Sequence, residues 1–344
     1  MTPRKRLRIA IVNDSILAQT VLARLVRHGG HEVLWLAPDG PTAVAQARAQ
    51  PPDLILMDLV MPRIDGAATT REILRVAPCL ILVVTSSLQA NLDLVYQAMS
   101  HGAQGAIETP ASADADSPST REFLDKLDSV GRLVRGASPA VPARPAREVA
   151  RQSASPLIVI GASTGGPAAL CTVLAAMGEA VPAPIVIIQH VAAAFAPGLA
   201  IWLAQHARFP VEVAVEGARP QVGHAVLAST DDHLVLDDLG ELHYTPQPVD
   251  NPYRPSVDVF LASAVHHWPG RGVAALLTGM GRDGAAGMLE ATRAGWWTVA
   301  QDEATSVVYG MPRAAKELGG ASVVLPIGDI GGAIARRVGE LARR

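Results

Sequence analysis

The sequence has little of what marks secreted, membrane-inserted or nucleic-acid-binding proteins. Its 344 residues include only two cysteines, Cys79 and Cys171, too few for a disulfide framework or a cysteine-rich zinc site. A formal net charge of −3 gives no basic surface for nucleic acid or an anionic membrane. We therefore expect a protein of a reducing compartment that does not bind nucleic acid, with two structural or incidental thiols.

Long hydrophobic runs are also missing. The N-terminal apolar run, Ile9–Val12, is shorter than the core of a signal peptide. The longest apolar stretch, Ile185–Ala204, is interrupted by Gln189, His190 and Pro197 and does not resemble a membrane span. An apolar fraction of 49% with only 18% charged residues excludes a disordered chain. These features predict a soluble, cytoplasmic protein without direct membrane insertion.

The chain alternates short β-rich runs with amphipathic stretches, a pattern that predicts parallel, doubly wound α/β sheets. In the first half the predicted strands and helices alternate as follows: Leu7–Val12, Ser15–Arg27, Glu32–Leu36, Pro41–Gln50, Leu54–Met57, Ala67–Ala77, Leu80–Val84, Ala90–Ser100, Gly105–Ile107 and Thr120–Val134. In the second half the predicted strands are Leu157–Ile160, Ile185–Ile188, Val211–Val215, Ala225–Ala228, Val273–Leu277 and Thr298–Ala300. The helices predicted there are Pro167–Met177, Pro197–Ala207, Val257–His266, Ala285–Ala294 and Met311–Leu318.

The two halves are separated by a segment rich in proline, alanine and serine. Residues 136–155 read GASPAVPARPAREVARQSAS and show no periodic apolar face. This composition favours an interdomain linker over a surface loop. We predict a domain over residues 1–135, a linker over 136–155 and a second domain over 156–344.

Polar side chains follow three predicted strands of the first domain. Asp14 follows the first strand, Asp58 the third and Thr85 the fourth. Ligands of such sheets bind beyond the carboxyl ends of the strands. Two carboxylates there suit Mg²⁺, and an aspartate can itself be a phosphoryl acceptor. Each residue alone could be a helix N-cap, but three on one edge favour a site.

The second domain opens with a G-x-S-x-G motif. Gly161, Ser163 and Gly165 lie between a predicted strand and a predicted helix, where a sharp turn exposes the serine hydroxyl. Backbone N–H groups at the start of that helix could stabilise an oxyanion. A glycine-rich turn whose serine only caps the helix is an equally good interpretation of the motif alone. The dinucleotide-binding and P-loop patterns are not satisfied.

A serine nucleophile needs a base and a group that orients the base. His190 ends the next predicted strand, and Asp283 follows a later apolar strand, so both lie at the same edge as Ser163. Of the other nine histidines, eight lack a partner pattern, and His233, which follows two aspartates, is interpreted as a surface residue. No H-E-x-x-H motif is present, which argues against a zinc protease.

The segments VNDS, LILMDLVMPRIDG and VVTS resemble the response-regulator receiver domain, over Arg8 to about Val134. The resemblance implies a flavodoxin-like fold and a histidine kinase that phosphorylates Asp58. It implies that Asp14, Asp58 and the carbonyl of Val60 hold Mg²⁺, and that Thr85 contacts the phosphoryl oxygen.

Three positions depart from the receiver pattern. Asn13 replaces one residue of the acidic pair, Thr109 replaces the lysine that precedes a proline, and Ala106 stands where the switch aromatic is expected. One metal carboxylate and one phosphate-pairing cation are therefore missing. We predict weaker metal binding and slower or altered phosphorylation.

The segments GASTGGP, IIQHV, YRPSVDVF, LLTGMGRDGAAGM and QDEATSVVYGMPRAA resemble the catalytic domain of the chemotaxis protein-glutamate methylesterases, the CheB family. The resemblance runs from about Leu157 to Ala335 and implies a Rossmann-like fold. It implies a Ser163–His190–Asp283 triad, with Thr164 and the Met280 backbone beside the nucleophile and the oxyanion.

The resemblance further implies the reaction and its partners. The expected substrates are glutamate methyl esters, and receptor glutamines, on methyl-accepting chemoreceptors, with no cofactor for hydrolysis. A chemotaxis-type histidine kinase would phosphorylate the receiver and relieve its inhibition of the catalytic domain. The VNDS and ETPA variants also resemble enzymes of Wsp-type surface-sensing systems.

Three other interpretations remain open from the residues. One is a non-catalytic signalling adaptor, and another is a serine hydrolase of a small ester. A transcriptional response regulator is disfavoured, because the second half is rich in predicted strands and not basic.

Overall fold

The computed structural model describes residues 6–110, 112, 114, 117–133 and 155–343. The chain divides into two compact units, residues 1–136 and 137–344. The predicted linker, residues 136–155, lies outside the described residues except for Ser155, so its role stays a prediction. No described helix is both long enough and apolar enough to cross a membrane.

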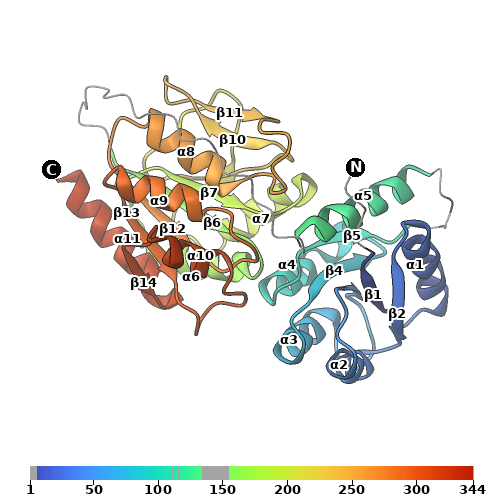
Figure 1. Cartoon of the computed structure of the whole chain (residues 1–344). Coiled ribbons are helices and arrows are strands. Elements are labelled where there is room, and N and C mark those ends of the chain that lie inside the picture. Colours follow the sequence, from blue (N-terminus) through green and yellow to red (C-terminus); the bar gives the residue numbers. More distant parts are fainter. Residues whose placement is uncertain (1–5, 111, 113, 115–116, 134–154, 344) are drawn as a thin grey trace. The chain divides into compact units, whose positions relative to one another are not determined.

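The first unit contains a five-stranded parallel sheet with the order β2-β1-β3-β4-β5 (Figure 1). Burial of both faces explains why its central strands are almost continuously apolar. Helix α2 packs against α3, α3 against α4, and α1 against α5. The elements are β1 (Arg8–Val12), α1 (Ile16–His28), β2 (Glu32–Ala37), α2 (Gly40–Ala49), β3 (Leu54–Asp58), α3 (Gly66–Val76), β4 (Leu80–Thr85), a 3₁₀ turn η1 (Gln89–Asn91), α4 (Leu92–Ser100), β5 (Gly105–Glu108) and α5 (Pro118–Leu133).

The second unit is built on a seven-stranded sheet whose neighbouring strands are all parallel, in the order β14-β13-β12-β6-β7-β9-β8. Strand β6 is in the middle of the sheet. The strands that follow it in the chain, β7, β8 and β9, lie on one side of β6, and β12, β13 and β14 lie on the other side. The strands are β6 (Leu157–Ala162), β7 (Ile185–Gln189), β8 (Val211–Val213), β9 (Ala225–Leu227), β12 (Gly272–Leu276), β13 (Trp297–Gln301) and β14 (Val323–Leu325).

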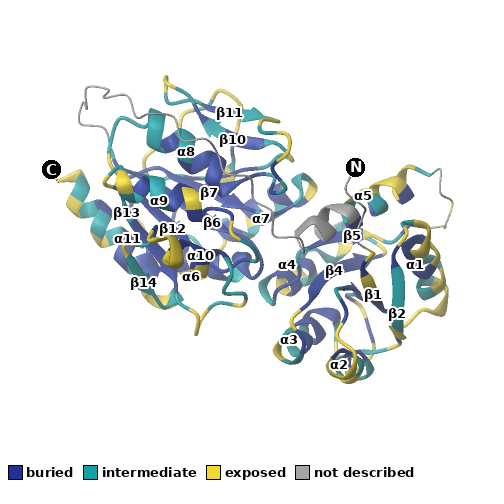
Figure 2. Cartoon of the chain, viewed as in Figure 1, coloured by how far each residue is buried: buried dark blue, intermediate teal, exposed yellow. Residues whose placement is uncertain are grey.

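This reversal makes the β6–β12 boundary the topological switch point, where sheets of this class form a crevice at the carboxyl ends. Helices cover both faces of the sheet, and its strands are buried (Figure 2). Helix α6 (Gly166–Ala176) packs against both α11 (Ile327–Ala342) and α7 (Ala196–Ala204), which follows a 3₁₀ turn η2 (Ala193–Phe195). Helix α9 (Ala285–Arg293) packs against both α8 (Val257–His267) and α10 (Met311–Leu318).

The predicted fold class, two doubly wound and mainly parallel α/β units, is confirmed. Sequence patterns missed an antiparallel hairpin, β10 (His233–Leu236) and β11 (Leu242–Thr245), which packs on α8 through β10. They also missed β14, and they extended the Val211–Val215 strand two residues beyond its end at Val213. These strands are three or four residues long, too short for a clear alternation.

The C-terminal helix α11 was also missed, because its glycines are poor helix formers. It buries Ile330, Ile334 and Val338, one face of a helix, at its contact with α6. A Cβ atom on Gly331 would lie 2.3 Å from the carbonyl oxygen of Val173. Glycine is therefore required there by the close approach of two helices, a property that intrinsic propensity does not encode.

Candidate active site

The predicted nucleophile, Ser163, lies directly after β6 and before α6. Its backbone N–H donates to the carbonyl of Thr278, 3.0 Å away, and its own carbonyl accepts from Gln189 Nε2 at 2.9 Å. The turn needs glycine at position 165, where φ is +76° and an added Cβ would lie 2.6 Å from Val307. The serine is thus held at the N-terminal end of α6 by Thr278, which follows β12, and by Gln189, which ends β7; these are the two strands next to β6.

His190 lies at the matching position on the adjacent strand. Ala162 of β6 pairs with Gln189 of β7, so Ser163 and His190 each follow the last pair of the ladder. The His190 backbone N–H donates to the Ala162 carbonyl at 3.1 Å, which continues the ladder by one step. The structure therefore brings the predicted nucleophile and base to one sheet edge, as expected.

Asp283 completes this edge from the loop that follows β12. Its Oδ2 lies 2.7 Å from His190 Nε2. The carboxylate is fully buried and accepts three further hydrogen bonds, from Ser256 Oγ and the backbone N–H groups of Val257 and Asp258. Burial by itself raises the pKa of Asp283, but the hydrogen bonds, that from His190 foremost, hold it below its usual value. Asp283 is therefore ionised at neutral pH.

This contact determines how the imidazole is turned. Nε2 faces the carboxylate, and Nδ1 is the ring nitrogen that does not contact Asp283. In the familiar Ser-His-Asp template the aspartate binds Nδ1 instead. Compared with that template, the other ring nitrogen contacts the aspartate here, which no sequence motif could have indicated.

Tyr253 holds the imidazole from one face. Its ring stacks on His190 with ring centroids 5.2 Å apart and an interplanar angle of 15°. Only 4% of the tyrosine is exposed. Burial raises its pKa, partly offset by a hydrogen bond from the Arg282 backbone, so the phenol stays neutral. Stacking of this kind restricts rotation of the base about its side-chain bonds.

The two predicted oxyanion residues also lie near Ser163. Thr164 is its neighbour in the chain and is buried, and its carbonyl accepts from Thr278 Oγ1 at 2.9 Å. Met280 follows Gly279, where an added Cβ would lie only 2.8 Å from Ser163 Cβ. Among the described residues, no acceptor is bound to the Met280 backbone N–H. Two backbone segments thus lie next to Ser163, as an oxyanion site requires.

Sequence reasoning missed the residues that support the triad. Tyr253 and Ser256 both lie in the segment YRPSVDVF, which was noted only for its resemblance. Ser256 has a recognisable signal, because it is the N-cap of α8 and accepts from Val259 N–H. The stack of Tyr253 on His190 has no local signal, because it depends on a contact between distant segments.

Two histidine interpretations were wrong. His233 is not a surface residue: it is fully buried on β10, and burial lowers its pKa. His243, expected to lack a partner, lies on β11 between Glu216 and Asp237, with contacts of 2.7 and 3.2 Å. Its pKa is raised, chiefly by the hydrogen bond to Glu216.

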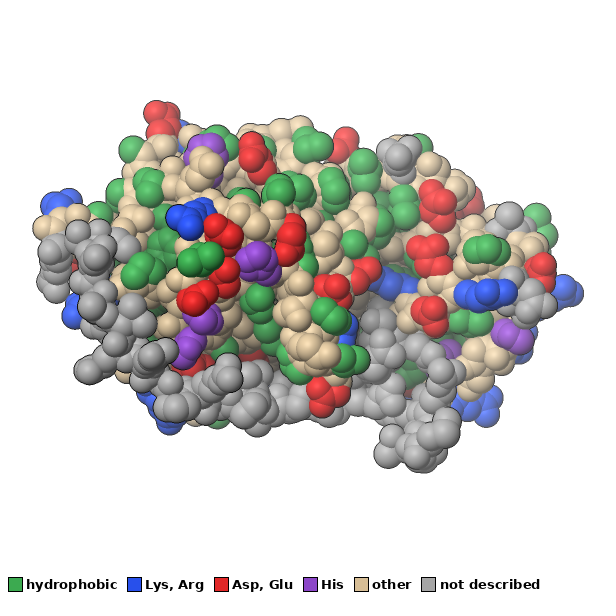
Figure 3. All heavy atoms as spheres, turned by 90° about the horizontal axis from the view of Figure 1, so that it is seen from above, with side chains coloured by type: hydrophobic (Ala, Val, Ile, Leu, Met, Phe, Trp, Pro, Cys, Tyr) green, Lys and Arg blue, Asp and Glu red, His purple; other side chains and the backbone are tan. Residues whose placement is uncertain are grey.

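This histidine belongs to a cluster of possible metal ligands on the hairpin: Asp237, Glu241 and His243 have ligand atoms within 4.8 Å of one another. Figure 3, seen from the hairpin side, shows histidine and acidic side chains next to one another on this unit. Glu241 pairs with Arg219 at 3.2 Å, and Asp237 accepts backbone N–H groups of its own turn. Through Glu216 and Arg219, these contacts tie the hairpin to the segment that follows β8.

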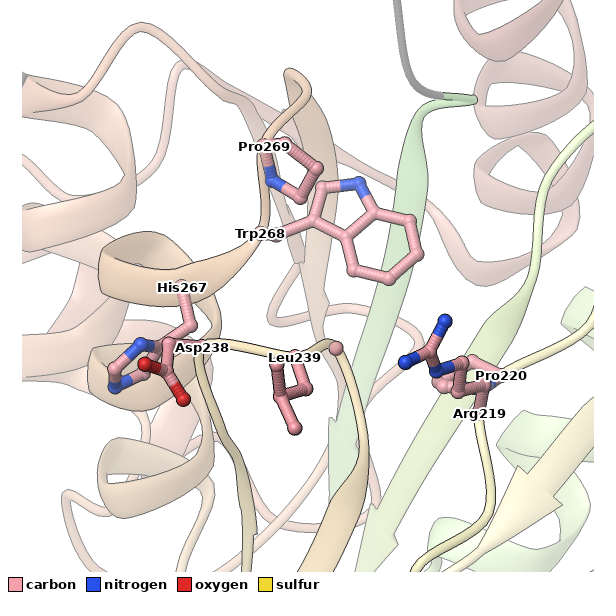
Figure 4. A pocket seen from close by; sticks show the side chains of 8 residues that line it. Arg219, Pro220, Asp238, Leu239, His267, Trp268 and Pro269 are labelled. Atoms are coloured by element: carbon pink, nitrogen blue, oxygen red, sulfur yellow. The ribbon is translucent and has the colours of Figure 1, made fainter. Parts of the chain in front are cut away.

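A cavity of about 280 Å³ lies elsewhere on the second unit, near the C-terminal end of α8 (Figure 4). Trp268 forms part of its wall, and the indole Nε1 donates to the carbonyl of Ser155. None of the predicted site residues lines it. The lining residues are Arg219, Pro220, Asp238, Leu239, Gly240, His267, Trp268 and Pro269.

In the first unit, Asp14, Asp58 and Thr85 lie at the carboxyl ends of β1, β3 and β4, as predicted. Burial raises the pKa of Asp58 to about 6, and the nearby charge of Asp14 adds to this effect. The Val60 backbone N–H donates to Asp58 at 3.4 Å. Thr85 Oγ1 accepts from Asn91 at 2.9 Å, which leaves its hydroxyl hydrogen free to be donated.

Of the three departures, Asn13 and Thr109 lie at this carboxyl edge, whereas Ala106 lies within β5, paired with Val83 of β4. Asn13 is buried and accepts the Ser15 backbone N–H at 2.8 Å. Thr109 donates its backbone N–H to the Thr85 carbonyl at 2.8 Å, immediately after β5, and Ala106 is buried on β5. Among the described residues, no lysine or arginine forms an ion pair with Asp58.

Comparisons with known proteins agree with this arrangement. A family model described as CheB methylesterase matches residues 158–334, and one described as response regulator receiver domain matches residues 9–115. A protein-glutamate methylesterase/protein-glutamine glutaminase of Burkholderia orbicola is 51% identical over 95% of this chain and 98% of its own length. A protein of the same name from Burkholderia thailandensis is 50% identical over 93% of this chain and 94% of its own length. The CheB methylesterase catalytic domain of Thermotoga maritima has a TM-score of 0.51 and 33% identity, covering 54% of this chain and 99% of that domain.

Proposed function

The chain belongs to the CheB methylesterase family, and from this premise we propose that it hydrolyses glutamate methyl esters on methyl-accepting chemoreceptors through Ser163, His190 and Asp283. The relatives are also named protein-glutamine glutaminases, so we extend the proposal to deamidation of receptor glutamines. A receiver domain precedes the catalytic domain, and phosphorylation of that receiver regulates the reaction. The proposed place of action is the cytoplasm.

The observation that carries the proposal is the 2.7 Å contact between His190 Nε2 and the buried Asp283. It joins the segments that follow β7 and β12, the two strands on either side of β6, and Ser163 directly follows β6. A carboxylate fixed in this way selects the tautomer with a proton on Nε2 and stabilises the imidazolium that forms during the reaction. A non-catalytic signalling adaptor does not require an imidazole that is held by a buried carboxylate at the same sheet edge as a serine.

The reaction follows from these positions. His190 Nδ1 takes the proton of Ser163 as the serine oxygen attacks the ester carbonyl carbon. The oxyanion that forms is stabilised by backbone N–H donors near Thr164 and Met280. The carbonyl then re-forms, the bond to the methoxy oxygen breaks, and the imidazolium protonates the leaving group to give methanol.

Hydrolysis of the acyl-enzyme completes the cycle. His190 deprotonates a water molecule that attacks the acyl carbon, and the proton then returns to the Ser163 oxygen as the glutamate carboxylate leaves. With a glutamine substrate the same first step releases ammonia in place of methanol. One arrangement of side chains thus serves both activities.

The direct test measures methanol released from membranes that contain radiomethylated chemoreceptors, using the full-length chain with and without a small acyl phosphate. We expect release that increases when the phosphodonor is present. Turnover of a small chromogenic ester without any release from receptors would favour the alternative hydrolase. Absence of both activities would favour the adaptor.

The receiver is a candidate Mg²⁺ site, and its residues fit such an ion. Asp14 and Asp58 place two carboxylates close enough for one to raise the pKa of the other, a repulsion that a divalent cation would offset. We propose that these carboxylates, with the Val60 carbonyl, hold the metal. Bound there, Mg²⁺ would neutralise charge on the incoming phosphoryl group. A histidine kinase of the chemotaxis type is the proposed donor.

We expect Mg²⁺ binding to this receiver to depend on pH. Protonated Asp58 must lose its proton before it can bind the ion, so binding should strengthen as pH rises from 5 to 7 through its pKa of about 6. The measurement is the increase in thermal midpoint on adding Mg²⁺, which should be larger at pH 7 than at pH 5.

Two variants control this measurement. D58N should lose most of the Mg²⁺-induced increase, whereas D53N should keep it, because Asp53 accepts the Arg8 backbone N–H at the opposite end of the sheet. An increase that is the same at both pH values, or unchanged in D58N, would place the metal elsewhere.

Two substitutions of Tyr253 should separate the contribution of its ring to kcat from that of its hydroxyl. Y253L removes the stack on His190 and should lower kcat for methanol release about tenfold, the upper end of what an aromatic pair contributes. Y253F keeps the ring and should retain most of kcat. Equal activity of Y253L and the wild type would show that the stack does not orient the base.

A further inference from the structure

Two helices of the catalytic domain begin side by side, and each has the carboxylate of the other at its N-terminus. Asp283 lies just before α9, yet its oxygens accept the backbone N–H groups of Val257 and Asp258 at the start of α8, at 2.7 and 3.2 Å. Asp258 lies in the first turn of α8, yet its Oδ1 accepts the Gly287 backbone N–H in the first turn of α9, at 2.7 Å. The two caps are reciprocal.

Both carboxyl groups are buried: Asp258 is 5% exposed and Asp283 is 0% exposed. The helix starts approach closely because glycines allow it. A Cβ on Gly284 would lie 2.9 Å from Val257 Cγ1, and one on Gly287 would lie 2.7 Å from Leu261 Cβ. A helix packed this tightly cannot shift without moving the residues that lead into it, which are the N-cap Gly284 and, before it, Asp283.

We propose that Asp258, which the catalytic cycle does not use, is a positioning residue for the triad. By capping α9 it fixes the first turn of that helix against α8, and so holds the Asp283 carboxylate at His190 Nε2. The inference rests on the proposed esterase function and adds a residue to its machinery. Asp258 acts through Asp283 and touches no substrate.

The protonation of Asp258 suits this role. Burial and the adjacent charge of Asp283 raise its pKa to about 8, in spite of hydrogen bonds from the first turn of α9. The neighbouring titratable groups are Asp283, Tyr253 and, across Asp283, His190. At neutral pH the pair therefore carries one negative charge, located on the residue that faces the imidazole.

Two substitutions in the full-length chain test the proposal. D258A removes the cap and should lower kcat for methanol release about tenfold to a hundredfold, with KM within about twofold, because misplacement of a catalytic group by about 1 Å has such an effect. D258N keeps an acceptor oxygen for Gly287 and should retain kcat within about threefold. D329A, at an exposed aspartate in the first turn of α11, is the matched control and should behave as wild type.

Three outcomes would overturn the proposal: undiminished kcat in D258A, equal loss in D258A and D258N, or the same loss in D329A. If D258A does not fold, the kcat of D258N relative to wild type still tests the role, and the pH dependence of its stability tests the protonation of the buried pair. The folded state keeps a proton on Asp258 that the unfolded state releases, so wild-type stability falls as pH rises from about 4 to about 8. The thermal midpoint of D258N relative to wild type should therefore rise across this range, and a constant difference would contradict the buried pair.

Failure of the proposed esterase function can be distinguished from failure of the positioning role of Asp258. If the wild type releases no methanol, the rate at which a fluorophosphonate labels Ser163 still reports activation of the serine by His190 and Asp283. Slower labelling of D258A than of D258N supports the positioning role, and equal labelling overturns it.

Discussion

Replacing Ser163 with alanine should reduce methanol release from methylated receptors by about 10⁴- to 10⁶-fold, as loss of the nucleophile does in other serine hydrolases. The variant should remain folded, because the hydrogen bonds that hold this turn are made by the backbone of residue 163 and survive the substitution. Its thermal midpoint should stay within about 2 °C of wild type.

S306A is the matched control, because the Ser306 hydroxyl caps its own loop by donating to the Asp302 carbonyl at 2.6 Å. It should retain full activity. Both variants are measured in the same radiomethylated receptor assay, with circular dichroism to confirm folding. If S163A retained more than about a hundredth of wild-type activity, Ser163 would not be the nucleophile.

Replacing Asp283 with asparagine should lower kcat by about 10⁴-fold, the effect of the equivalent change in other triads. An amide cannot stabilise the imidazolium, and an NH₂ group turned toward His190 Nε2 would select the wrong tautomer. Asparagine also accepts fewer of the hydrogen bonds that Ser256, Val257 and Asp258 donate to the carboxylate. A fall of several degrees in the thermal midpoint is therefore expected as well.

The loss of stability and the loss of catalysis can be separated in one experiment. In the double variant S163A/D283N, activity should be no lower than in S163A alone, because residues that act as a unit are not additive. A further fall in the double variant would show that Asp283 supports activity by a route that does not involve the serine. The thermal midpoint of the double variant should match that of D283N.

The positions of the three proposed triad residues could be predicted because each follows a strand in a parallel sheet. Strands of this kind are short apolar runs whose ends can be recognised in the sequence, and their carboxyl ends meet at one edge of the sheet. Ser163, His190 and Asp283 were chosen on that basis, and the structure places all three at the expected edge. The same reasoning placed Asp14, Asp58 and Thr85 in the receiver.

The supporting residues could not be predicted in this way. Tyr253 contacts His190, and Asp258 caps α9, across intervals of chain whose length carries no information about contact. The fully buried His233 was mistaken for a surface residue because its short strand is flanked by aspartates. Helix α11 was missed because the glycines that lower its propensity are what allow it to approach α6.

The sequence by itself therefore determined the two α/β units, the order of the strands along the chain and the residue types at their ends. Only the tertiary structure decided that His190 presents Nε2, and not Nδ1, to Asp283, and that two buried carboxyl groups cap each other's helices. The physical reason is that strands and helices form from local patterns of apolar residues. Which imidazole nitrogen faces a carboxylate, and whether a buried acid is protonated, depend on neighbours that folding brings together.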